Sequence, residues 1–326
     1  MKGMDKMSVS FYIKNKKKLF GFGGIERVLN VEEALLISEN VEQFTFSEEE
    51  VSDNPELLKN SLEEIYLIMG IYEKSFRGFE LHYEGEIQSY SVRINTPSTK
   101  TDWLIALNYI KSLASYLKSD IECENGEKYN SENIMRFNFL YDIRFGIKSM
   151  QDIADSEDYS NSSIHYAILG RKVCFNREMI KKIINSEDPV QEYEKTVNEV
   201  VYANAYFANQ AFFKKTDTEE IIGRYVLSEN LRTILPYKPA VEFFNSNEIV
   251  NNENIKKWIL CFVAFENNKE IPDVGEMDYS DFIKFLPKEK YSFIDAEQIL
   301  VEEMTSNEIR EIYKDVFSFF ENTVQD

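Results

Sequence analysis

Histidine and cysteine supply most of the nucleophiles and proton-transfer groups that act near pH 7. This chain of 326 residues has only two histidines, His82 and His165, and three cysteines, Cys123, Cys174 and Cys261. None of the five lies in the short spacing of a zinc site or a CxxC redox pair. The sequence therefore predicts no structural metal and no cofactor, and unpaired cysteines are typical of a reducing, cytoplasmic environment.

His82 stands between two carboxylates on an expected strand. Glu80, His82 and Glu84 alternate with apolar residues, so the three polar side chains should share one face of that strand. A histidine and a carboxylate at neighbouring positions of one face could share a metal ion, but a metal site needs a third or fourth convergent ligand, and the sequence identifies none. We therefore expect a solvated polar face.

His165 and Cys174 form the second pair that could do chemistry, because an imidazole can activate a thiolate. The pair Gly170-Arg171 suits a tight two-residue hairpin turn. This turn would place Cys174 opposite Ala167 and leave His165 one diagonal step away. Diagonal neighbours on a sheet lie about 7–8 Å apart, which is too far for a hydrogen bond. The spacing thus favours ordinary strand packing over a nucleophilic site.

The common enzyme motifs are missing. The cluster Gly21-Phe22-Gly23-Gly24 matches neither the GxxxxGK[ST] phosphate loop nor the GxGxxG dinucleotide motif, and GxSxG and HExxH do not occur. The chain has 57 acidic residues, so no carboxylate pair is marked out as catalytic. A metal-independent or carboxylate-based enzyme, with a site built from scattered residues, remains the alternative function.

The formal net charge is −20, and it is unevenly distributed. Residues 1–28 contain seven basic and two acidic side chains, a net of +5, so the rest of the chain carries −25. An acidic body repels the phosphates of nucleic acid, and it attracts basic proteins. No apolar stretch is long enough to span a membrane.

These features favour a non-catalytic interaction protein that binds a basic protein. An immunity or antitoxin role, in which the chain neutralises a cationic toxin, would be one such case. The candidate contacts are acidic residues that cluster in expected loops. They are Glu48, Glu49, Glu50, Asp152, Asp155, Glu157 and Asp158.

The elements that position these residues follow from local patterns. Alternation predicts a strand over 8–13, a hairpin over 79–84 and 87–95, and a returning strand over 121–123. Capping boxes at Asn30, Thr99 and Thr305 predict three helix starts. Two further helices are expected, from Pro55 to about Met69 and from Pro189 to about Phe213.

Strands and helices do not alternate regularly, so we expect an α+β fold with mixed, mainly antiparallel sheets and packed helices in two lobes. The polar stretch 151–163 is the candidate linker. It separates an N-terminal α+β lobe, residues 1–150, from a C-terminal α+β lobe, residues 164–326.

Three segments carry a resemblance to a known family. They are MSVSFYIKNKKKLFGF from Met7, NVEEALLISENVEQFTFSEEE, and RINTPSTKTDWLIALNYIKSLASYL. Over most of its length the chain resembles an uncharacterised family of low-GC bacteria that is described as a domain of unknown function. The resemblance implies a complete bacterial cytosolic protein, and it assigns no activity, cofactor or site residue.

Overall fold

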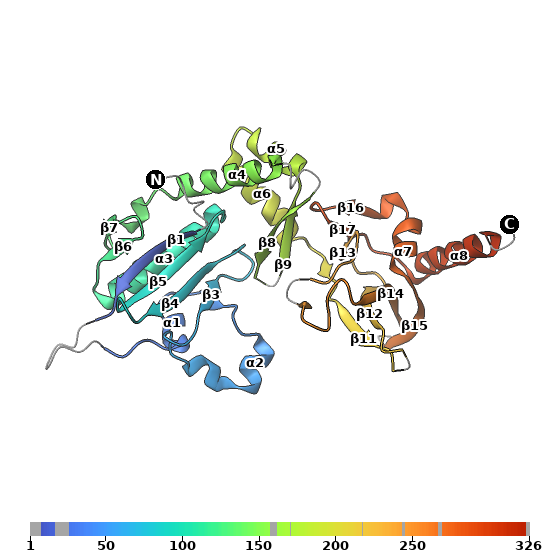
Figure 1. The fold of residues 1–326 in the computed structure, drawn as a ribbon, viewed down its shortest axis with the longest axis horizontal. Helices are drawn as coiled ribbons and strands as arrows, with labels where there is room; N and C mark the ends of the chain where they lie inside the picture. Colours follow the sequence, from blue (N-terminus) through green and yellow to red (C-terminus); the bar gives the residue numbers. More distant parts are fainter. Residues whose placement is uncertain are drawn as a thin grey trace. The chain divides into compact units, whose positions relative to one another are not determined.

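The structure is a computed structural model that describes residues 8–16, 26–156, 162–169, 171–216, 218–242, 245–266 and 269–323. The chain divides into two compact units, Met1–Tyr202 and Ala203–Asp326 (Figure 1). Both contain helices packed on sheets that are mainly antiparallel, so the predicted α+β class is confirmed. None of the helices in the described part of the chain is long and apolar enough to cross a membrane.

A seven-stranded sheet organises the first unit, in the order β2-β3-β4-β5-β1-β6-β7 with antiparallel neighbours. The predicted hairpin and returning strand are confirmed, because β4 pairs with β5 and β6 pairs with β1. Buried and less buried residues alternate along β4, which gives the sheet one core face. The strands are β1 (Ser8–Lys14), β2 (Glu42–Gln43), β3 (Leu67–Gly70), β4 (Phe79–Glu84), β5 (Ser89–Asn95), β6 (Ile121–Cys123) and β7 (Lys128–Tyr129).

Helix α3 (Lys100–Leu117) packs on the core face of this sheet. It begins at the predicted capping box, in which Thr99 and Asp102 satisfy each other's backbone N–H groups. The ring of Tyr109 lies 5.0 Å from the ring of Phe79 on β4, centroid to centroid. The apolar side of α3 therefore faces the same side of β4 as Phe79.

The carboxylate of Asp102 also holds the loop that precedes β4. It accepts hydrogen bonds from the backbone N–H groups of Phe76, Arg77 and Gly78, at 3.0, 3.1 and 3.0 Å. Gly78 has a φ of +61°, and a Cβ atom there would lie 2.1 Å from the carbonyl oxygen of Met69. One buried carboxylate and one glycine thus fix this turn against the start of α3.

The segment before β3 differs from the prediction. It contains α1 (Val31–Leu35), α2 (Glu48–Asp53) and the 3-10 helix η1 (Pro55–Lys59). Asn30 and Glu33 form the predicted capping box of α1. The predicted helix from Pro55 to Met69 is wrong, because η1 ends at Lys59 and Leu67–Gly70 is a strand. Leu67 and Met69 are buried while Ile68 is exposed, and this two-residue alternation outweighs the apolar positions at helical spacing.

The first unit continues through two strands, three further α-helices and one 3-10 helix. These are η2 (Ile134–Arg136, a 3-10 helix), α4 (Phe139–Asp155), β8 (Ile164–Ile168), β9 (Arg171–Phe175), α5 (Arg177–Ile184) and α6 (Pro189–Val201). Helix α4 contacts α5 and α6, and β9 contacts α6, so the segment 164–201 packs within the first unit. The division at Tyr202 lies later than the predicted linker 151–163, of which residues 151–155 continue α4.

The second unit contains two four-stranded sheets, ordered β10-β13-β17-β16 and β11-β12-β14-β15. Each includes one parallel pair, β10 with β13 and β12 with β14. The strands are β10 (Tyr206–Phe207), β11 (Ala211–Lys214), β12 (Ile221–Ser228), β13 (Thr233–Pro236), β14 (Ile255–Glu266), β15 (Lys269–Asp278), β16 (Tyr291–Phe293) and β17 (Gln298–Val301). The helices are α7 (Tyr279–Phe285), η5 (Lys288–Lys290, a 3-10 helix) and α8 (Ser306–Thr323).

Two helix predictions bear on this unit. The predicted helix from Pro189 ends at Val201 instead of Phe213, because residues 206–207 and 211–214 pair as strands. The capping box at Thr305 is confirmed, and Ile309 and Ile312 of α8 are buried. The side chains of Val316 and Phe320, further along the same helix, lie outside the described residues.

Candidate functional site

His82 lies on the face of β4 opposite the face that carries Phe79. Glu80, His82 and Glu84 alternate along β4 with buried apolar residues, as predicted. Glu80 accepts hydrogen bonds from Arg93 at 3.2 Å and from Asn95 at 2.9 Å, both on β5. Glu80 is therefore engaged by the neighbouring strand, and Glu84 is the carboxylate that pairs with His82.

His82 is covered by other side chains and is not solvated. Its side chain is 11% exposed, and its Nε2 lies 3.3 Å from a carboxylate oxygen of Glu84. The ring of Tyr66 stacks on the imidazole at 4.1 Å between centroids. The Nδ1 atom is buried and has no hydrogen-bond partner in the described part of the chain. Burial lowers the pKa of His82, and the carboxylate of Glu84 offsets part of this decrease.

The burial of His82 leads to a testable prediction. Because burial disfavours the charged imidazole, folded His82 should bind its proton only at a pH below the ordinary midpoint of 6.5. Removing the covering ring with Tyr66→Ala should raise the midpoint toward 6.5. The measurement is an NMR titration of the His82 ring, with Tyr72→Ala as the control because Tyr72 is equally exposed, 64% against 62% for Tyr66. An unchanged midpoint in Tyr66→Ala would show that other groups cause the burial.

The second histidine lies beside a cysteine, which corrects the sequence analysis. In the β8–β9 hairpin His165 is directly opposite Cys174, and Ala167 is opposite Lys172. The strands pair up to Ile168 and Arg171, so Arg171 belongs to β9 and not to the predicted two-residue turn. Gly170, half of that predicted turn, lies outside the described residues.

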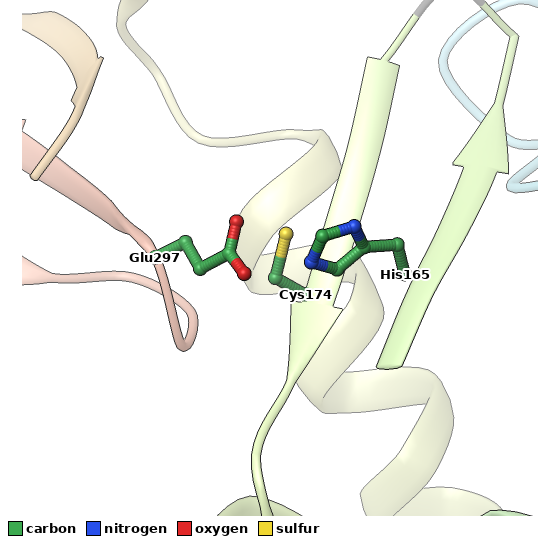
Figure 2. Close-up of side chains that lie close together, drawn as sticks. All are labelled: His165, Cys174 and Glu297. Atoms are coloured by element: carbon green, nitrogen blue, oxygen red, sulfur yellow. The ribbon is translucent and has the colours of Figure 1, made fainter. Parts of the chain in front are cut away.

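The two side chains approach each other closely. The ligand atoms of His165 and Cys174, a ring nitrogen and Sγ, lie within 4.8 Å. Figure 2 shows the imidazole and the thiol side by side on the two paired strands. His165 is exposed, whereas Cys174 is buried. Glu297, the third side chain in Figure 2, belongs to the second unit, where its backbone N–H donates to Asp295.

Acidic side chains are concentrated in residues 31–73, which we call the acidic region. This region has twelve carboxylates and one lysine, a net charge of −11. All but Glu33 are exposed, and among the described residues only Glu33 and Glu56 form ion pairs, with Arg27 and Lys59. The carboxylates are Glu32, Glu33, Glu39, Glu42, Glu48, Glu49, Glu50, Asp53, Glu56, Glu63, Glu64 and Glu73.

The acidic region is locally compact and also exposes apolar side chains. Helices α1 and α2 both contact η1, and β2 pairs with β3 at one edge of the sheet. Figure 1 shows α1 and α2, in blue, below β3 and β4 in this view. Leu36 is 80% exposed, and Tyr66 and Tyr72 are 62% and 64% exposed. Aromatic side chains surrounded by charge are typical anchors of protein interfaces.

The predicted partner-binding residues divide into three groups. Glu48, Glu49 and Glu50 are exposed on α2, where Glu50 also caps the helix by accepting from Ser47. Asp152 and Asp155 lie on α4 and pair with Lys148 at 2.9 Å and with Arg177 at 2.7 Å. Glu157 and Asp158 lie outside the described residues. The wider acidic region went unnoticed in the sequence, although the count of one lysine against twelve acids would have revealed it.

A pocket of about 260 Å³ lies near the end of β1 and the last turn of α3, lined in part by Asn15, Arg27, Glu33 and Tyr116. Arg27, its one basic residue, is already engaged, because both terminal nitrogens of Arg27 donate to the Glu33 carboxylate. Small-molecule sites usually enclose about 300–1,000 Å³. This pocket thus offers little support for a catalytic site.

Comparison with known proteins gives one match. The family model described as Domain of unknown function (DUF4299) matches residues 8–312. No curated protein and no solved structure matches the chain. The match covers both units and attaches no activity to any residue.

Proposed function

We propose, for a chain that belongs to the DUF4299 family of unknown function, that the acidic region binds a basic protein and that this binding is non-catalytic. The observation that carries the proposal is the charge of −11 over residues 31–73, where a single lysine is present and is already paired. Ten of the twelve carboxylates form no ion pair within the described residues. They are available to a cationic surface.

Two physical effects would act together at this surface. The uncompensated charge raises the rate at which a basic partner arrives, because long-range attraction steers the encounter. The exposed rings of Tyr66 and Tyr72 and the side chain of Leu36 provide apolar area that a partner can bury. Charge therefore sets the association rate, and the apolar side chains slow the dissociation.

The alternative, an enzyme without a metal, has one observation in its favour. The Glu84 carboxylate next to Nε2 of His82 has the arrangement of a base and the group that orients it. However, Nδ1 of His82 is buried, so a substrate could reach it only after Tyr66 moves. The binding proposal requires no such movement, which is why we prefer it.

The binding proposal is tested by neutralising two carboxylates. We expect Glu48→Gln with Glu49→Gln to slow association with the partner several-fold at low salt and to change dissociation much less. The matched control is Glu132→Gln with Glu187→Gln, which removes the same charge at exposed positions outside the acidic region. The partner is first captured from a native extract and identified, and rates are then measured at two salt concentrations.

Two outcomes would contradict the proposal. One is capture of partners that are themselves acidic. The other is an association rate that is indifferent to salt, or that falls equally in the control variant. Screening shortens the reach of the charge to about 8 Å at physiological ionic strength, so a specific acidic surface must show a steep salt dependence.

A further inference from the structure

We infer that His165 and Cys174 form a binding site for a soft divalent metal ion such as Zn²⁺. The two residues are direct cross-strand partners on β8 and β9, and the ring nitrogen and Sγ lie within 4.8 Å (Figure 2). This site is separate from the acidic region, and it does not depend on the proposed binding function.

The donor set selects the metal. A thiolate and an imidazole are the protein ligands that Zn²⁺ and copper prefer, whereas Mg²⁺ and Ca²⁺ require oxygen atoms. With Zn–S near 2.3 Å and Zn–N near 2.0–2.1 Å, tetrahedral coordination places the sulfur and nitrogen about 3.6 Å apart. The ring nitrogen of His165 and Sγ of Cys174 already lie within 4.8 Å, so a small rotation of the exposed His165 side chain is enough to reach this separation.

The hairpin register makes the pair suitable for a metal. Residues directly opposite each other on antiparallel strands hold their Cβ atoms about 4.5–5.5 Å apart, and both side chains then lie on the same face of the hairpin. Phe175, the residue next to Cys174, is buried and stacks on Tyr193 of α6 with ring centroids 5.9 Å apart. This packing fixes β9, so one of the two ligands is held in place before the metal arrives.

The burial of Cys174 favours its use as a metal ligand over its use as a catalytic nucleophile. Cys174 is completely buried, so the carbon atom of a substrate could not approach Sγ along the line that nucleophilic attack requires. A single ion is small enough to enter beside the exposed imidazole of His165. Binding replaces the S–H bond with an S–metal bond and releases the proton to solvent, with no change of oxidation state. Two of the four coordination positions are left for water or another ligand.

The experiment is a titration of the full-length protein with Co²⁺, a spectroscopic substitute for Zn²⁺. We expect thiolate-to-cobalt charge-transfer absorption in the near ultraviolet, and we expect one equivalent of Zn²⁺ to displace it. Cys174→Ser should abolish this band. His165→Ala should weaken Co²⁺ binding at least about tenfold, since loss of even an outer-shell partner costs about 10–100-fold.

The chain supplies its own matched controls. Cys123→Ser and Cys261→Ser each remove another buried thiol, and His82→Ala removes the other histidine. These three variants should retain the charge-transfer band. Absence of the band in the wild type, or its persistence in Cys174→Ser, would overturn the inference. Circular dichroism of each variant shows whether it is folded, and the exposed position of His165 makes His165→Ala the decisive variant if Cys174→Ser unfolds.

Discussion

Asp102→Ala is expected to lower the free energy of unfolding of the first unit by about 4 kcal/mol or more. The Asp102 carboxylate is fully buried and accepts backbone N–H groups from residues 76, 77, 78 and 99, as well as the hydroxyl of Thr99. Each buried donor left without an acceptor costs about 1–3 kcal/mol, and the alanine variant leaves several at once.

The measurement is urea unfolding followed by fluorescence in a Trp258→Phe background. The chain has two tryptophans, so Trp103 is then the only one, and it reports on the first unit. Asp188→Ala is the matched control, because Asp188 caps α6 through only two backbone N–H groups. Removal of an ordinary cap typically costs about 1 kcal/mol. Equal losses in the two variants would mean that the loop at residues 76–78 is held by other contacts.

Trp103→Ala should cost about 3–5 kcal/mol, because the side chain is fully buried. Its ring stacks on Phe137 and Phe139, with centroids 5.5 and 6.0 Å away. Trp103 lies in the first turn of α3 and begins the buried, apolar side of that helix. Amide hydrogen exchange of the α3 peptides, measured by mass spectrometry, gives the loss without a need for tryptophan fluorescence.

A second substitution at position 103, Trp103→Phe, separates the packing of the ring from the cost of the unsatisfied indole N–H. The indole nitrogen of Trp103 is buried and has no hydrogen-bond partner among the described residues. Trp103→Phe keeps most of the ring and removes this unsatisfied donor, so it should cost clearly less than Trp103→Ala. Near-wild-type stability of Trp103→Ala would show that the residue is not a core anchor. Equal losses for Phe and Ala would show that the outer ring of the indole carries the packing.

Local sequence patterns predicted an element correctly wherever that element depends only on residues a few positions away. The capping boxes at Asn30, Thr99 and Thr305 need only one side chain and the backbone three positions away, and all three are present. The β4–β5 hairpin was predicted because each strand alternates and Gly85 lies between them. These interactions form within one segment, so the sequence of that segment determines them.

Packing between distant segments overrode local patterns elsewhere. Apolar residues from Leu58 to Met69 have the spacing of a helix, yet the last of them form strand β3 because β4 offers it hydrogen bonds and a core face. Residues 164–202 belong with the first unit because α5 and α6 pack on α4. Neither partner can be recognised from the segment itself.

The candidate sites show the same division between sequence and tertiary structure. The sequence by itself determined the residue types: an acidic region with one lysine, and a chain with only two histidines and three cysteines. Tertiary structure decided which of them meet. The β8–β9 register differs from the predicted one by two residues, and this shift turns His165 from a diagonal neighbour of Cys174 into its direct partner. A shift of two keeps every side chain on the same face, so the polar and apolar pattern cannot distinguish the registers. The two registers are distinguished only by the pairing in the folded hairpin, in which Ile168 is opposite Arg171.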